Sequence, residues 1–182
     1  MAMTTTPIYF GPFLVTSQVF YITRLSFALV NLKPLVPGHV LVCPIRRVPR
    51  FTDLTPNETA DLFLTVRQVS RMIERLYQAS SLNIAIQDGI DAGQSVPHVH
   101  THIIPRKKSD MDDQGGSDAI YGMMNGPGGN IGRHQWEAMD ARRASFPSVD
   151  NDAREPRSME EMRREAETLA KEMEKEVDEN KL

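Results

Sequence analysis

Short runs of apolar, mostly β-branched or aromatic residues follow one another through the first hundred positions. They lie at Leu14–Ile22, Ser26–Asn31, His39–Pro44, Leu82–Gln87 and His98–Ile104. Runs of this length, several of them alternating polar and apolar residues, are typical of β-strands. Because most are joined by short turns, the pattern predicts a mainly antiparallel sheet.

One long amphipathic helix is predicted between the third and fourth runs. Thr55 offers an N-cap, Pro56 suits the first helical position, and Glu58 completes a capping box. Apolar residues then recur every three or four positions, at Leu62, Val66, Val69, Ile73 and Leu76. A sheet covered on one face by such a helix predicts an α+β fold.

Composition divides the chain into three parts. Residues 1–106 hold the predicted strands and the long helix and form the expected core. Residues 107–155 hold seven of the eleven glycines among polar residues, which predicts a largely mobile loop. Residues 156–182 begin with a second capping box and form a charged helix with one apolar stripe. That stripe favours packing on the domain, with a partner-binding role as the alternative.

Length, charge and cysteine content narrow the class of protein. With 182 residues, 40% of them hydrophobic and 25% charged, the chain is typical of one globular domain. A net charge of −3 argues against nucleic-acid and anionic-membrane partners, and no apolar run approaches the roughly 18 residues of a membrane span. Cys43 is the only cysteine, which fits a reducing compartment. We expect a cytoplasmic location, with the nucleus as a second candidate.

Three of the five histidines, His98, His100 and His102, alternate within five residues of one predicted strand. Side chains on a strand alternate faces, so these imidazoles should point the same way. Their protonated forms would repel one another without evident benefit to the fold, which favours a chemical role. Two chemistries fit. They are zinc ligation and nucleophilic attack by a neutral imidazole on an α-phosphoryl group.

The residues just before the triplet favour the phosphoryl chemistry. Gly93 allows the backbone to approach an anion closely, and Gln94 and Ser95 add neutral hydrogen-bond donors. A zinc site would call for further carboxylates or histidines, and only Asp91 stands nearby. We therefore predict a phosphate-binding loop without a resident metal.

This region also resembles a known family. Gln87-Asp88-Gly89, the run Gly93–Lys107 around the triplet, and the earlier run Leu25–Pro44 are similar to the histidine-triad (HIT) nucleotide hydrolases. The Gln-Asp-Gly and Pro-Arg-Lys flanks favour the fragile-histidine-triad branch, the bis(5′-adenosyl)-triphosphatases. The resemblance spans roughly residues 8–124 and the C-terminal helix.

The resemblance implies a reaction and a set of roles. His100 would attack the α-phosphorus of diadenosine triphosphate and form a covalent adenylyl-histidine, releasing ADP, and water would then release AMP. His102 would stabilise the α-phosphate, and His98 would orient the nucleophile, with His39 behind it. Substrate contacts would come from Asn31, Gln87, Gly93, Gln94, Ser95, Val96 and His102.

The resemblance also has implications for metal ions, oligomeric state and regulation, and other functions of the same superfamily stay open. Mg²⁺ or Mn²⁺ would accompany the substrate phosphates without an organic cofactor, the protein would be a homodimer, and Tyr121 would match a phosphorylated loop tyrosine. A nucleoside phosphoramidase, a nucleotidylyltransferase or a nucleotide-binding signalling module are the alternatives. Phe13 stands where some relatives place a substrate-contacting histidine, and an aromatic ring there could stack on a base. His134 and Trp136 receive no role.

Overall fold

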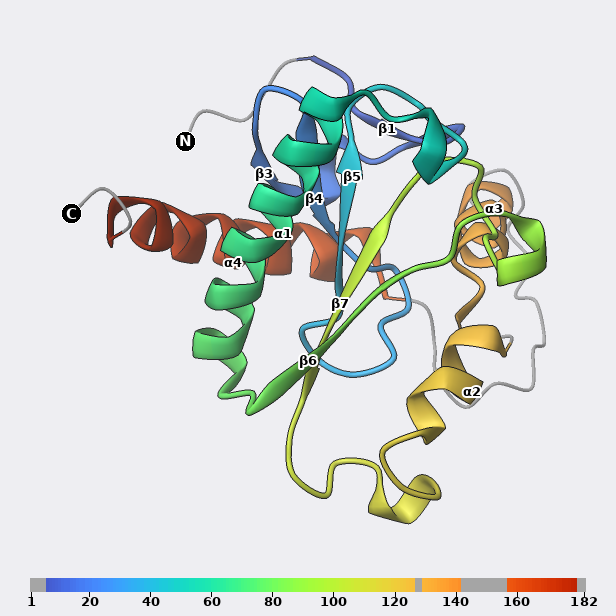
Figure 1. The fold of residues 1–182 in the computed structure, drawn as a ribbon, viewed down its shortest axis with the longest axis vertical. Helices are drawn as coiled ribbons and strands as arrows, with labels where there is room; N and C mark the ends of the chain where they lie inside the picture. The colour runs from blue at the N-terminus through green and yellow to red at the C-terminus, as the bar shows by residue number, and fades with distance from the viewer. Residues whose placement is uncertain (1–5, 127–128, 142–156, 180–182) are drawn as a thin grey trace.

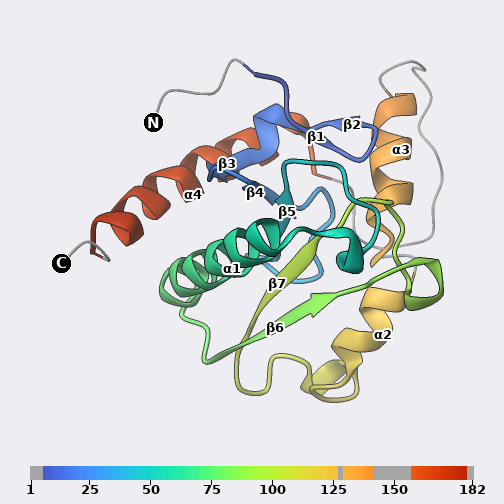
Figure 2. The same cartoon turned by 45° about the horizontal axis from the view of Figure 1, so that its top comes forward.

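The protein is built around one five-stranded sheet with elements on both of its faces (Figure 1, Figure 2). The computed structural model describes residues 6–126, 129–141 and 157–179. The sheet has the order β3-β4-β5-β7-β6, and all neighbouring pairs are antiparallel. Its strands are β3 (Val19–Ile22), β4 (Ser26–Val30), β5 (Val40–Pro44), β6 (Ser81–Ile86) and β7 (Thr101–Arg106). The predicted antiparallel α+β fold is therefore confirmed.

Two long helices, α1 (Pro56–Tyr77) and α4 (Met159–Glu179), cover one face of the sheet. The predicted capping box starts α1, because Thr55 Oγ1 accepts from the Glu58 N–H while the Glu58 carboxylate accepts from the Thr55 N–H. The apolar stripes of both helices are buried against the strands. This core includes Val42, Ile103, Leu62, Val69, Leu169 and Met173.

The opposite face is covered by smaller elements. The hairpin β1 (Tyr9–Phe10) and β2 (Phe13–Leu14) packs on β4 and β5 through the cluster that holds Phe10, Phe27 and Leu41. Two short helices, α2 (Ala119–Asn125) and α3 (Ile131–Ala141), lie beside the segment between β6 and β7 (Figure 2). The functional histidines lie on this face.

The expected loop at residues 107–155 contains these two helices, so that prediction is wrong for residues 119–125 and 131–141. The physical reason is apolar burial that the glycine content concealed. Ile120 and Met124 of α2 pack with Ile104 of β7, and Ile131 of α3 joins the cluster under the hairpin. Residues 127–128 and 142–155 of the predicted loop lie outside the described residues.

Two predicted strands also differ from the observed ones. The run Leu14–Ile22 is interrupted by a 3-10 turn at Thr16–Gln18 before β3 begins. The histidine strand begins only at Thr101. Pro97 has no N–H to offer a neighbouring strand, and the Val99 N–H donates to the Val48 carbonyl rather than to the sheet ladder. His98 and His100 therefore precede β7, and only His102 lies within it.

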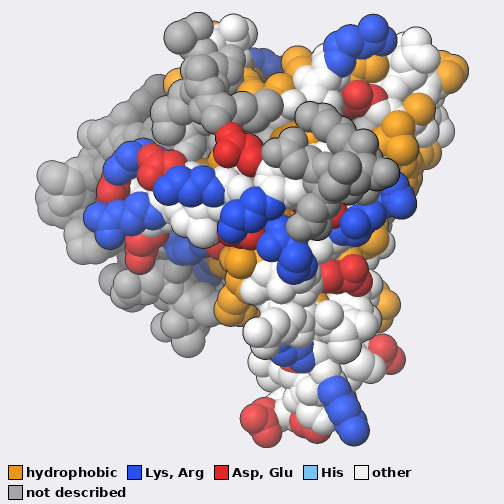
Figure 3. All heavy atoms as spheres, turned by 90° about the vertical axis from the view of Figure 1, so that its left-hand side faces the viewer, with side chains coloured by type: hydrophobic (Ala, Val, Ile, Leu, Met, Phe, Trp, Pro, Cys, Tyr) orange, Lys and Arg blue, Asp and Glu red, His pale blue; other side chains and the backbone are white. Residues whose placement is uncertain are grey.

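The exposed side of α4 is charged. Basic and acidic side chains interleave on the face shown in Figure 3, and Arg163 pairs with Glu160 and Glu167 of the same helix. Exposed pairs of this kind contribute little to stability because solvent screens them. Within the described part of the chain, no helix combines the length and apolarity that crossing a membrane requires.

Candidate active site

The three histidines converge on the sheet face that carries the hairpin. All three are almost fully buried, with exposed fractions of 0% for His98, 1% for His100 and 2% for His102. The His100 and His102 ring centroids are 5.1 Å apart. The structure thus places all three rings on one face, as predicted, although two of them precede the strand.

His98 is held at both ring nitrogens by the main chain. The Gly11 N–H donates to Nδ1 at 3.0 Å, so the proton of this imidazole is on Nε2, which donates to the Pro44 carbonyl at 2.8 Å. Burial lowers the pKa of His98 to about 4. His98 is therefore a neutral anchor between the hairpin and β5, and its side chain has no nitrogen left for substrate.

His100 is oriented by the main chain of His98. Its Nδ1–H donates to the His98 carbonyl at 2.7 Å, which leaves the lone pair on Nε2. Burial holds the pKa of His100 below its ordinary value. Nε2 is buried and has no hydrogen-bond partner among the described residues. This is the protonation state that a nucleophilic imidazole requires.

His102 belongs to a second hydrogen-bonded chain. The Leu35 N–H donates to His39 Nδ1 at 3.2 Å, so His39 carries its proton on Nε2, which lies 2.9 Å from His102 Nδ1. His102 Nδ1 therefore accepts, and its own proton is on Nε2. That N–H has no partner within the described part of the chain. It is a donor suited to an oxygen on which negative charge develops.

The second chain corrects one sequence-based expectation. His39 was expected behind His98, but it backs His102, and their ring centroids are 5.2 Å apart. Buried Asn31 lies beside the same chain, with Nδ2 3.5 Å from His39 Nε2 and Oδ1 accepting from the Lys33 N–H. His98 instead depends on Gly11 and Pro44, for which the local sequence carries no signal.

The expected phosphate-binding loop is ordered by its own contacts. Gln94 donates from Nε2 to the Pro49 carbonyl at 2.9 Å and accepts from the Gly89 N–H at Oε1, so its amide shapes the loop. Gly93 has a φ of +88°, and a Cβ there would lie 2.5 Å from Gln87 Nε2. Glycine is therefore required at this position. Val96 is buried beneath the hairpin.

Two side chains expected to contact substrate form hydrogen bonds with the helices that follow β7. Gln87 Nε2 donates to Asn125 Oδ1 of α2 at 3.2 Å. Ser95 Oγ accepts from the Gly132 N–H of α3 at 3.0 Å. Asn125 and Gly132 were missed because they lie in the glycine-rich segment that was interpreted as a loop.

Phe13 does not offer a stacking surface. It is 2% exposed, and its ring meets the Trp136 ring edge-on with centroids 5.1 Å apart. In this conformation Phe13 therefore has no free ring face for a base. Tyr121 of α2 is half exposed, and its hydroxyl oxygen accepts from Asn83 Nδ2 at 3.4 Å.

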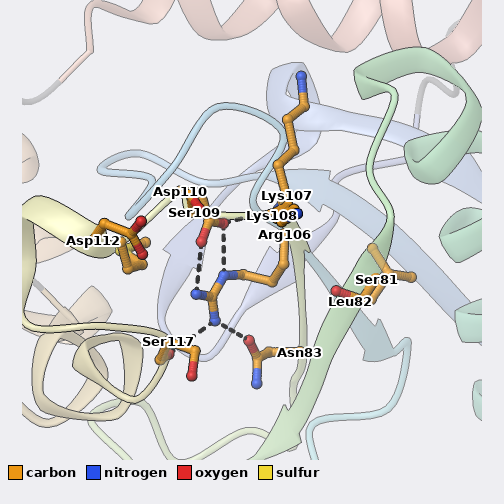
Figure 4. A pocket seen from close by; sticks show the side chains of 11 residues that line it. Ser81, Leu82, Asn83, Arg106, Lys107, Lys108, Ser109, Asp110, Asp112 and Ser117 are labelled. Atoms are coloured by element: carbon orange, nitrogen blue, oxygen red, sulfur yellow. Dashed lines mark hydrogen bonds and ion pairs between the residues drawn. The ribbon is translucent and has the colours of Figure 1, made fainter.

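A cavity of about 290 Å³ lies at the other end of β6 and β7 (Figure 4). Arg106 donates to both carboxylate oxygens of Asp110, at 2.8 and 2.9 Å, and to Asn83 Oδ1 at 2.6 Å. A further bond goes to the Ser117 carbonyl. Since these partners occupy its donors, Arg106 clamps the segment after β7 onto β6. Among the described residues, no group of three or more histidine, cysteine, aspartate or glutamate side chains is arranged to hold a metal ion.

Three neighbouring histidines, one on β7 and two just before it, beside a glycine-containing loop are the arrangement expected of a histidine-triad protein. The HIT domain model matches residues 14–109, and the chain belongs to this family. The expected branch is confirmed by relatives named for it. The chain is 55% identical over 122 residues to the bifunctional bis(5′-adenosyl)-triphosphatase/adenylylsulfatase FHIT of Arabidopsis thaliana, a match that covers 66% of each chain.

Other relatives extend this likeness over most of the chain. The asymmetrical bis(5′-nucleosyl)-tetraphosphatase of Schizosaccharomyces pombe is 50% identical over 172 residues, covering 89% of this chain and 92% of that one. The crystal structure of Plasmodium falciparum diadenosine triphosphate hydrolase is 27% identical, covers 96% of this chain and 88% of that one, and has a TM-score of 0.67. The NitFhit protein of C. elegans is 36% identical with a TM-score of 0.65, covering 93% of this chain and 31% of that one.

Proposed function

We propose that the protein hydrolyses dinucleoside polyphosphates, with diadenosine triphosphate cleaved to AMP and ADP through a covalent adenylyl-histidine at His100. The observation that carries this proposal is the pair of neighbouring imidazoles with opposite Nε2 states. His100 offers a lone pair, while His102 offers an N–H. A nucleophile beside an oxyanion donor is what attack on a phosphoryl group requires.

In the first step, His100 Nε2 attacks the α-phosphorus, a phosphorus–nitrogen bond forms, and the bond from this phosphorus to the bridging oxygen breaks. ADP leaves with that oxygen and its electron pair. The His98 carbonyl stabilises the positive charge that the His100 ring gains, because it accepts the Nδ1–H. The His102 N–H donates to a non-bridging oxygen of the α-phosphate. In the second step, water attacks the same phosphorus and the phosphorus–nitrogen bond breaks, with its electron pair returning to His100 Nε2. AMP leaves, and the proton from the water is released to solvent.

Both tri- and tetraphosphate substrates occur in the names of the relatives, so the proposed substrate class is the dinucleoside polyphosphate. Mg²⁺ or Mn²⁺ would enter with the substrate phosphates, since such ions typically keep several waters and bind through phosphate oxygens. The proposed setting is the cytoplasm, with the nucleus as a second compartment. Tyr121, half exposed on α2, is the proposed phosphorylation site.

We also propose a homodimer. β6 is an outer strand of the sheet, and Ile84 on it is 49% exposed. Outer strands present unpaired backbone groups that a second strand can satisfy. Analytical ultracentrifugation of the wild type and of Ile84→Lys tests this, since the dimer should weaken in the variant. A monomeric wild type would contradict it.

The activity is tested by incubating the protein with diadenosine tri- and tetraphosphate in ¹⁸O-labelled water. For the triphosphate, AMP should carry the label and ADP should not, because water enters at the adenylylated phosphorus. Label in ADP would exclude attack at the proposed phosphorus. Faster cleavage of an adenosine phosphoramidate than of either dinucleotide would favour the phosphoramidase alternative.

A further inference from the structure

The N-terminus of α3 sits directly on the phosphate-binding loop. The Gly132 N–H donates to Ser95 Oγ at 3.0 Å, and the approach is so close that a Cβ on Gly132 would lie 2.3 Å from the Ser95 carbonyl oxygen. Ser95 therefore has a partner from within the chain at the hydroxyl that the proposed function gives to the substrate phosphates.

Apolar contacts dock the same helix on either side of Ser95. Ile131 is 4% exposed and shares a cluster with Val96, the residue after Ser95. One turn further along, Trp136 covers the ring of Phe13 on the hairpin. Asn130 caps α3, because its Oδ1 accepts from the Arg133 N–H at 2.8 Å. These contacts position the N-terminal part of the helix on the loop and the hairpin.

In the conformation with α3 docked, the proposed nucleophile is buried and substrate cannot reach it. His100 is 1% exposed, and its Nε2 is buried without a hydrogen-bond partner among the described residues. Attack on a phosphorus atom needs the two reacting atoms at about 3–3.5 Å. The described conformation is therefore closed, and substrate entry requires some covering element to move.

We propose that α3 is a latch on the phosphate-binding loop: its first turn lies against the Ser95 main chain, and the substrate phosphates displace it when they occupy that space. This inference rests on the proposed function, and it adds a device that controls access to the same site.

The latch has a measurable consequence for affinity. When only a fraction of molecules is open, the apparent dissociation constant is the intrinsic one divided by that fraction. Releasing the latch should therefore tighten nucleotide binding, even though it removes a contact from the closed structure. A helix that contributed to nucleotide binding would have the opposite effect.

Gly132→Ala tests the latch, because the added methyl group collides with the Ser95 backbone while every loop residue stays unchanged. The matched control is Gly122→Ala on α2, where an added Cβ has no atom within 4 Å. The probe is AMP, titrated by isothermal calorimetry so that no turnover is needed. We expect Gly132→Ala to lower the dissociation constant at least about threefold, and Gly122→Ala to match the wild type. An unchanged or weakened affinity in Gly132→Ala overturns the latch.

Trp136 gives a second measurement that needs no variant. It is the only tryptophan of the chain, and it packs on Phe13 when α3 is docked. The ring is already 52% exposed when docked, so AMP should change its emission and increase its quenching by acrylamide because the contact with Phe13 is lost. If emission does not respond to saturating AMP, α3 stays docked and the latch is wrong. Hydrolysis of dinucleotides by the same wild-type preparation is assayed separately, so the latch can fail while the proposed function stands.

Discussion

Two regions flank the phosphate-binding loop, the histidines and the helix α3, and they differ in the contacts that fix them. On the histidine side, main-chain groups of Gly11, Pro44, Leu35 and His98 fix which nitrogen of each ring carries the proton. On the α3 side, the Gly132 N–H and the apolar contacts of Ile131 hold a helix over Ser95. The chemistry is therefore built into the core, while access depends on a peripheral helix. Variants on the first side should change kcat, and variants on the second should change substrate affinity.

The largest effect is expected for His100→Ala. The variant loses the atom that forms the covalent bond, so kcat for diadenosine triphosphate should fall by at least about 10⁴-fold. Circular dichroism should show the wild-type fold. A variant that keeps more than a tenth of wild-type turnover would place the nucleophile elsewhere.

The second largest effect is expected for His39→Leu, although the proposed mechanism gives the His39 side chain no contact with substrate. Without the donor to Nδ1, His102 is free to carry its proton on the wrong nitrogen, so kcat should fall about tenfold or more while KM changes little. His39→Gln can accept from the Leu35 N–H and donate to His102, and it should restore much of kcat. Equal losses in both variants would show that the hydrogen bond from His39 does not set the proton position on His102.

Lowering the pH should reduce the free energy of unfolding, because the buried histidines are neutral in the folded state. The folded pKa of His98 is about 4, against an unfolded value of about 6.5. The unfolded state therefore binds more protons between these pH values, and His98 contributes about 3 kcal/mol of stability above pH 6.5 that is lost as the pH falls towards 4.

Urea unfolding at stepwise pH values measures this loss. Activity should follow the same direction, because the pKa of His100 is also lowered. Its acid limb should lie below pH 6.5. A free energy of unfolding that stays flat between pH 6.5 and 4 would show that the buried rings are not neutral in the folded state.

The smallest effect is expected on the helical face of the sheet. Thr55→Ala removes the cap of α1 and should lower the free energy of unfolding by about 1 kcal/mol. Because α1 covers the face opposite the histidines, kcat and KM should not change. A change in kcat would show that the two faces are coupled.

Local patterns were sufficient for much of the fold. The apolar spacing and capping box predicted α1 because both signals lie within a few residues of one another. The start of β7 was placed too early, since the pattern of His98–Ile104 does not show that the Val99 N–H bonds to distant Val48. The helices α2 and α3 were missed because their stability comes from burying Ile120, Met124 and Ile131 rather than from local propensity.

For the site, too, features local in sequence could be predicted and long-range contacts could not. The triplet and the glycine before it predicted phosphoryl chemistry, because those residues lie together in sequence. The partner of His102 could not be found in this way, since His39 lies 63 residues earlier and reaches it only through the pairing of β5 with β7. The docking of Gly132 on Ser95, 37 residues apart, depends equally on the folded chain.

The covalent step is tested most directly by mixing the protein with diadenosine triphosphate and stopping the reaction rapidly, without adding acid or base. The peptides are then examined by mass spectrometry. The account predicts a peptide heavier by one adenylyl group, with the modification at His100 and absent from His100→Ala. Adenylylation at His98, His102 or another residue would contradict it.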